Sequence, residues 1–204
     1  MDCKKSVIVY LLACLVLWSS DGLAQQFPSE MWHKGFVLTA QRDTVVGEIK
    51  YDMVANSIQV RARKKDYSFS SHNLLLCEFL DATIDSKRRF YSMPYELQKG
   101  FKARVLFELL FEGPTSLLSR EEIVRETTPT NNIYGGPISR NRLKYDYYLL
   151  DNKGSIRYFS GRRQDLLALL SDKSRELKSF IKQNKLKTDE VRDLIRIIAF
   201  YNSI

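Results

Sequence analysis

The spacing of apolar residues is the feature that most constrains this chain. Over roughly its first three quarters, apolar and polar residues alternate in short runs, which is the period of a strand that buries one face. The clearest run covers residues 57–63, whose apolar side chains all fall on one face. Polar turn residues separate two pairs of such runs, so hairpins are expected around residues 41–43 and 151–154.

Other segments of the same region have less decisive patterns. Residues 74–80 form a dense apolar run that is typical of a central strand, and residues 88–93 are predicted to form a strand that ends near Pro94. Residues 105–111 are apolar over too short a stretch to choose between strand and helix. Residues 126–142 are polar and rich in Pro, Gly and Asn, which predicts a loop.

Beyond residue 160 the apolar spacing becomes helical, with side chains at i, i+3, i+4 and i+7. Helices are predicted near residues 166–170, around Phe180, and in a last segment capped by Thr188. The last helix has a broad apolar arc that includes Ile195, which we expect to be buried. Phe200 projects on the polar side of the same helix, away from that arc.

Strands first and helices last are typical of the α+β class rather than of parallel α/β proteins. We expect an antiparallel, β-rich core over residues 25–160, sandwich-like or barrel-like. A C-terminal unit of two or three short helices, residues 161–204, should pack on that core. Cys77 is the only cysteine after residue 24, so that part of the chain has no internal disulfide, and its apolar neighbours predict a buried side chain.

Residues 1–24 have the order of a secretory signal peptide. Lys4 and Lys5 precede an apolar run that ends at Trp18, and small residues then lead to Ala24. The apolar run is shorter than the roughly 20 residues that a membrane-spanning helix needs. We therefore expect cleavage after Ala24 and an exported protein in the periplasm or associated with the cell envelope.

A second interpretation of the N-terminus concerns Cys14, which follows Leu11-Leu12-Ala13 as in a bacterial lipoprotein cleavage box. Lipidation of Cys14 would anchor the protein to a membrane. The apolar stretch before Cys14 is very short, and apolar residues continue to Trp18, so the signal peptide is the favoured interpretation.

The formal net charge is +8, and the basic excess lies mainly in the C-terminal quarter. Two groups of residues are candidate contacts for an anion or a partner. They are Arg61, Arg63, Lys64 and Lys65 in the first group, and Arg175, Lys178, Lys182 and Lys185 in the second, with Phe200 as a further partner contact. The second group lies along one side of a helix and would suit an anionic envelope surface. Solvated strand and helix faces explain both groups without a ligand. The basic run 87–89 is a weaker candidate for phosphate or sulfate.

No motif identifies a reaction. The two histidines, His33 and His72, are far apart, which argues against a metal site, and no Gly-x-Ser-x-Gly elbow is present. The glycine pair in residues 134–137 lacks the lysine of a phosphate-binding loop, so no cofactor is expected. The leading hypothesis is a non-enzymatic envelope module that binds another envelope protein. The alternative is an exported hydrolase whose carboxylates, Tyr and His come from distant parts of the sequence. Export argues against nucleic acid as a partner.

Residues 35–39 and 43–49, near the start of the chain after residue 24, and residues 165–167, 169–173, 180–182, 184–187 and 201–203, near its end, carry a resemblance. These segments resemble a group of uncharacterised exported proteins from Bacteroidota. The resemblance implies a location in the cell envelope. It implies no reaction, cofactor or site residue.

The signal-peptide interpretation predicts that the mature protein begins at Gln25, because cleavage follows the small residues that end at Ala24. N-terminal sequencing and intact mass measurement of the exported protein will test this. A mature chain that begins with a lipidated Cys14 would contradict it.

Overall fold

The structure is a computed structural model that describes residues 26–128 and 136–204. The predicted signal peptide, the alternative site at Cys14 and residues 129–135 lie outside the described residues. Within the described residues no helix is long and apolar enough to cross a membrane.

The β strands form one antiparallel sheet with the order β10-β9-β8-β7-β6-β5-β1-β2-β3-β4. The strands are β1 (His33–Thr39), β2 (Thr44–Asp52), β3 (Ser57–Ala62), β4 (Lys65–Ser70), β5 (Leu74–Asp81), β6 (Ser86–Gln98), β7 (Phe101–Phe111), β8 (Ser116–Thr128), β9 (Ile138–Leu150) and β10 (Ile156–Phe159). Neighbours in the sheet are neighbours in sequence except where β1 pairs with β5, so most of the sheet is built from consecutive hairpins.

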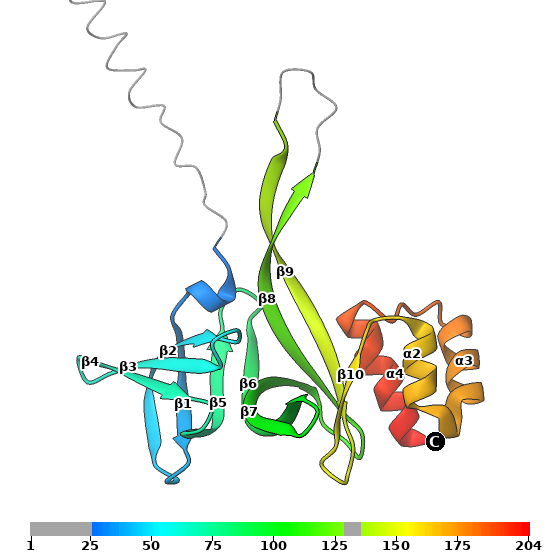
Figure 1. Cartoon of the computed structure of the whole chain (residues 1–204), viewed down its shortest axis with the longest axis horizontal. Helices are drawn as coiled ribbons and strands as arrows, with labels where there is room; N and C mark the ends of the chain where they lie inside the picture. Colours follow the sequence, from blue (N-terminus) through cyan, green and yellow to red (C-terminus); the bar gives the residue numbers. More distant parts are fainter. Residues whose placement is uncertain (1–25, 129–135) are drawn as a thin grey trace, which may run out of the picture.

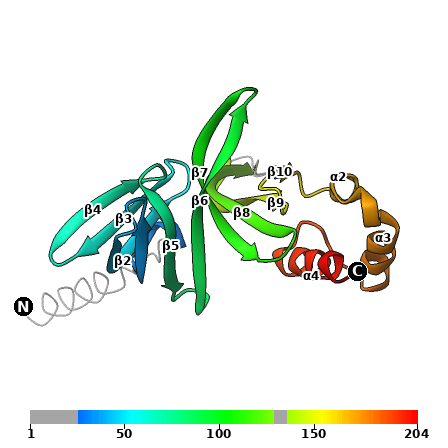
Figure 2. The same ribbon diagram turned by 90° about the horizontal axis from the view of Figure 1, so that it is seen from below.

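The helices follow the sheet, as the α+β prediction requires. They are α2 (Arg163–Leu169), η2 (Ser171–Lys173), α3 (Ser174–Gln183) and α4 (Val191–Ser203), and a short helix η1 (Pro28–Glu30) precedes β1. The β1–β5 half of the sheet lies at one end of the molecule and the helices lie at the other, with β6–β9 between them (Figures 1 and 2). The strands therefore form a single extended sheet, and the helices lie at one end of it.

The apolar interior follows this division. One cluster lies on β1–β6 and includes Phe79, Phe90 and the free thiol of Cys77, which is 0% exposed as predicted. A second cluster lies between the C-terminal helices and the strands β7–β10, with Leu117 and Ile198 at its centre. The helical unit is thus packed on the sheet through its own core.

Several predicted elements are confirmed with small shifts. Both expected hairpins are present, β1–β2 and β9–β10. The apolar face predicted for residues 57–63 is buried in β3, and the turn that follows it lies at Arg63 and Lys64. Residues 105–111, left undecided between strand and helix, belong to β7.

Two strand boundaries were predicted wrongly. Strand β6 does not end near Pro94 but continues to Gln98. Its pairing with β5 stops at Tyr91 while its pairing with β7 continues, so Pro94 lies where one edge of β6 is free and a missing N–H is tolerated. The predicted loop 126–142 is also wrong in its described parts, because β8 extends to Thr128 and β9 begins at Ile138.

The last helix differs from its prediction at three residues. Thr188 does not cap α4; Glu190 is the N-cap residue, and the Thr188 hydroxyl donates to the Gly161 carbonyl oxygen instead. Ile195 is only partly buried, whereas its neighbour Leu194 is 0% exposed. Phe200 does not project free of the apolar arc.

The Phe200 ring stacks on the Phe180 ring of α3, with ring centroids 4.0 Å apart and planes 8° apart. This side of α4 is polar on a helical wheel, but α3 covers it near the C-terminal end of the chain. The predicted exposure of Phe200 is therefore wrong, since the ring is shared between two helices.

Burial in the helical unit predicts an order of mutational effects. Ile198→Ala should reduce the free energy of unfolding by about 2–5 kcal/mol, because it empties space at the centre of the second cluster. Ile195→Ala should cost distinctly less, because that side chain is only partly buried. Chemical denaturation of both variants measures the difference. Equal and small losses would mean that the helical unit does not share a cooperative core with the sheet.

Candidate functional site

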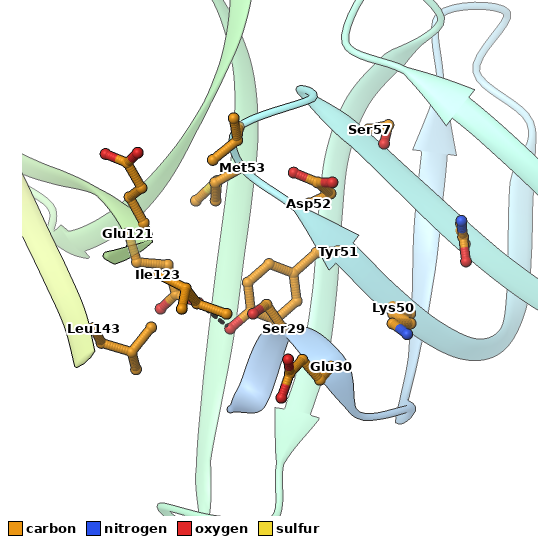
Figure 3. A pocket seen from close by; sticks show the side chains of 13 residues that line it. Ser29, Glu30, Lys50, Tyr51, Asp52, Met53, Ser57, Glu121, Ile123 and Leu143 are labelled. Atoms are coloured by element: carbon orange, nitrogen blue, oxygen red, sulfur yellow. Dashed lines mark hydrogen bonds between the residues drawn. The ribbon is translucent and has the colours of Figure 1, made fainter. Parts of the chain in front are cut away.

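A pocket of about 560 Å³ lies between the two halves of the sheet. One wall comes from η1, β2, β3 and the turn between these strands, and the other comes from β8 and β9 (Figure 3). Met53, Val54, Ile123 and Leu143 supply its apolar surface. The pocket therefore depends on how the N-terminal strands are held against the β8–β9 hairpin.

Tyr51 and Glu121 join the two walls. The Tyr51 hydroxyl donates a hydrogen bond of 2.5 Å to Glu121 Oε1, and Figure 3 shows the Tyr51 ring pointing from the β2 wall toward the opposite wall. Both residues are buried, at 2% and 5% exposure. Because Tyr51 and Glu121 belong to opposite walls, this hydrogen bond fixes the distance between the walls.

Beneath this contact the guanidinium of Arg88 is the centre of a buried cluster. Its Nε and Nη2 donate to the two carboxylate oxygens of Glu108, at 2.7 and 2.6 Å, in the bidentate geometry that arginine favours. Nη2 also donates to Glu121 Oε2 at 2.8 Å, and Nη1 donates to the Tyr51 hydroxyl oxygen at 2.5 Å. A longer contact of 3.4 Å joins Nη1 to Asp81 Oδ2.

The cluster contains more negative than positive charge. Three buried carboxylates, Asp81, Glu108 and Glu121, surround the single guanidinium of Arg88. The Nδ1 atom of His33 lies 3.9 Å from Asp81 Oδ1, and the Nε2 atom of the same ring is 2.7 Å from the Pro28 carbonyl oxygen. Desolvated charges of this kind are stable only when every partner is in place. Within the described residues, no buried side-chain nitrogen or oxygen lacks a hydrogen-bond partner.

The surroundings move the pKa of three groups. Burial raises the pKa of the Tyr51 hydroxyl strongly, so the phenol stays protonated and remains a donor. Burial works to lower the pKa of Arg88, but the hydrogen bonds and charges of its carboxylate partners outweigh this and raise it. Burial alone would raise the pKa of Asp81. Hydrogen bonds from Thr83 and the charge of Arg88 reverse that effect and lower it.

A second arginine holds the rim of the pocket. Arg120 on β8 donates to the side chain of Asn56 at 2.8 Å and to the Leu106 carbonyl oxygen at 2.6 Å. It also donates to the carbonyl oxygen of Met53, in the turn between β2 and β3. Arg120 thus fastens the turn that carries part of one pocket wall to the strand that carries the other.

The titratable groups that line the pocket are mostly acidic: Glu30, Asp52, Glu121 and Glu122 against Lys50. Two of them have local structural roles, because Glu30 accepts from the Phe27 backbone N–H and Asp52 accepts from the Ala55 backbone N–H. Glu122 and Lys50 make no side-chain hydrogen bond or ion pair with the described part of the chain. Glu122 is exposed, and these two residues are the groups most available to a ligand.

The structure brings none of the predicted contact residues into this pocket. Arg61 is exposed, pairs with Asp66 at 3.0 Å, and lies 4.2 Å from the centre of the Trp32 ring. The other members of its group, Arg63, Lys64 and Lys65, occupy the β3–β4 turn and the start of β4.

The second predicted group lies at the other end of the molecule from the β3–β4 hairpin (Figures 1 and 2). Arg175, Lys178, Lys182 and Lys185 are exposed on α3 and just after it. The two basic groups do not form one surface.

Sequence reasoning missed the buried cluster because its members come from separate strands. The sequence offers Arg88 as a phosphate or sulfate contact within the basic run 87–89, but Arg88 is 6% exposed and its guanidinium is bound by carboxylates of the protein. The signal was present in the alternation along β6, which places Arg88 on the same face as Phe90 while Lys87 and Arg89 point the other way. The alternation along β2 likewise places Tyr51 on the face of Ile49, but no comparable pattern marks Glu121.

The described residues contain no group of three or more His, Cys, Asp and Glu side chains arranged to hold a metal ion. Comparisons with protein-family models, with curated proteins and with solved structures found no match to this chain. The geometry of the pocket and of the Arg88 cluster is therefore the basis for any statement about function.

The buried cluster predicts how stability depends on Arg88. Arg88→Met should reduce the free energy of unfolding at pH 7 by about 3–5 kcal/mol, because it leaves buried carboxylates without a cation. Arg89→Met is the matched control. It breaks an exposed pair with Glu78, with the Arg89 side chain 46% exposed, and should cost less than about 1 kcal/mol. Urea denaturation of both variants makes the comparison.

The stabilities of the wild-type protein and of Arg88→Met should depend on pH in opposite directions. In the wild-type protein the folded-state pKa of Asp81 is lower than its unfolded-state pKa. The ionised Asp81 carboxylate therefore stabilises the fold above the unfolded-state pKa, and this contribution is lost as the pH falls through the folded-state pKa. In Arg88→Met the uncompensated carboxylates take up protons in the folded state, so the loss shrinks as the pH is lowered from 7 toward 5. A loss that stays constant with pH would argue against charge burial as its cause.

Proposed function

We propose that this protein is an exported, non-enzymatic binding module of the cell envelope. Its ligand, in this proposal, is a cationic group of another envelope protein, such as a lysine or arginine side chain in a basic segment. Export is supported by the signal-peptide order of residues 1–24 and by the resemblance at both ends of the chain.

The observation that carries the proposal is the sign of the charge in and below the pocket. Four carboxylates and one ammonium group line it, and the Arg88 cluster beneath it adds Asp81 and Glu108. This concentration of negative charge occurs in a chain with a net charge of +8. A concave site with low-dielectric walls strengthens the field of such charges and favours a cationic ligand.

The inner carboxylate supports binding rather than catalysis. Both oxygens of Glu121 already accept hydrogen bonds, one from Tyr51 and one from Arg88. A general acid or base must exchange its proton with the substrate, and Glu121 would have to lose one of these bonds to do so. Glu122 and the apolar residues of the wall remain free to contact a ligand, which suits recognition.

The alternative function is an exported hydrolase. It is favoured by the convergence of Asp52, Glu121, Glu122 and Tyr51 on one pocket, since two carboxylates on either side of a substrate are the usual machinery for glycoside cleavage. Turnover of chromogenic glycosides or esters by the purified protein, abolished by Glu122→Gln, would favour this alternative. Absence of turnover with retained binding of a cationic peptide would favour the binding module.

The binding proposal predicts effects of opposite sign from two pocket residues. With a fluorescent trilysine peptide as the probe, Glu122→Gln should weaken binding by about 1 kcal/mol, because it removes an exposed carboxylate that makes no hydrogen bond or ion pair with the described residues. Lys50→Gln should strengthen binding, because it removes the cation from the pocket. Fluorescence anisotropy at low ionic strength measures both.

The matched control for these variants is Glu112→Gln. Glu112 is also an exposed glutamate without a side-chain partner in the described residues, but it lies in the β7–β8 turn and does not line the pocket. It should leave the affinity unchanged. If Glu112→Gln weakens binding as much as Glu122→Gln does, the peptide responds to overall charge and the pocket is not its site.

A further inference from the structure

Helix α3 is the outermost element at the C-terminal end of the molecule (Figures 1 and 2). Its inner side is fully used in packing, because Leu177 and Ile181 are buried in the second apolar cluster and Phe180 stacks on Phe200. It packs against α2 and α4. The opposite side of α3 is therefore the end face of the protein.

That end face is lined with cations. Arg175, Lys178 and Lys182 follow one another at intervals of three and four residues along α3, and Lys185 continues the series just after the helix. At 100° per residue the three positions within α3, Arg175, Lys178 and Lys182, lie on one side of the helix. The acidic residue of α3, Glu176, falls on a different side and does not interrupt the series.

The side chains of these four cations are also unpaired among the residues that the structure describes. None of the four side chains makes a hydrogen bond or ion pair with the described residues. Some exposed cations elsewhere do pair with a nearby carboxylate, as Arg61, Arg142 and Arg196 do. The charge on the face of α3 is thus uncompensated within the described part of the chain.

We propose that this face of α3 docks the protein on the surface of an anionic lipid bilayer. Each cation held near such a surface strengthens binding by about fivefold, and the contribution falls off within a Debye length. A specific protein partner would need an apolar centre surrounded by polar residues. The face of α3 offers cations and the small polar Ser179 but no large apolar side chain, which suits a diffuse anionic surface.

The proposal is independent of the pocket, which lies in another part of the molecule and carries the opposite charge. Docking through α3 would hold the protein at the bilayer by its C-terminal end. The acidic pocket, between the β2–β3 wall and the β8–β9 hairpin, would then stay free for its own ligand.

Vesicle sedimentation tests the proposal with the full protein. Wild type should bind vesicles of phosphatidylcholine that contain about one third phosphatidylglycerol, should release them in high salt, and should not bind phosphatidylcholine alone. The triple variant Lys178→Gln, Lys182→Gln, Lys185→Gln should lower the partition coefficient about a hundredfold, as expected for three cations at about fivefold each.

A second triple variant, Arg63→Gln, Lys64→Gln, Lys65→Gln, changes the net charge equally at the opposite end of the molecule and should bind vesicles as wild type does. Thermal melts of both triple variants should match wild type, because the substituted side chains are exposed. Equal losses in the two variants, equal binding to neutral vesicles, or binding of wild type to heparin but not to anionic vesicles would each overturn the proposal.

Discussion

The guanidinium of Arg88 is where the two halves of the sheet meet. It stands on β6, between the strands that carry Tyr51 and Asp81 and those that carry Glu108 and Glu121. Taking an arginine and three carboxylates out of water is costly, and the cost is recovered only when all their hydrogen bonds form together. The cluster therefore favours one arrangement of the sheet over near alternatives. A slip of β7 or β8 by one residue would turn Glu108 or Glu121 away from the guanidinium.

The pocket follows from the same constraint. Its walls belong to strands that are far apart in the sheet order, and they are held in place by the Tyr51–Glu121 hydrogen bond below and by the contacts of Arg120 at the rim. Because the cluster contains more carboxylates than cations, it also contributes to the negative charge of the pocket. Basic residues elsewhere, including those on α3 and in the β3–β4 hairpin, give the chain its positive net charge. The protein thus presents surfaces of opposite sign, which underlies the separate binding proposals for the pocket and for the face of α3.

The sequence predicted well those elements in which the spacing of apolar residues matches the spacing of buried side chains. The alternation of residues 57–62 is the burial pattern of β3, and the dense run that begins at Leu74 is a central strand. The failures share a different cause. The ribbon formed by the outer parts of β8 and β9 is exposed on both sides near its end, so no alternation marks it. The predictions for Pro94 and Phe200 are wrong because each depends on a neighbouring element. Pro94 is tolerated within β6 because β5 does not pair with the strand there, and Phe200 is covered because α3 packs over it.

The sequence by itself determined the α+β class, the order of strands before helices, the buried state of Cys77 and the basic side of α3. Each depends on spacing or composition within one segment, where a period of 2 or 3.6 residues says which side chains share a face. Only the tertiary structure decided that Arg88 is the centre of a buried ion cluster and that an acidic pocket lies above it. The members of that cluster span residues 51 to 121, and their meeting depends on strand order and register. Long-range pairing of this kind leaves no period in the local sequence.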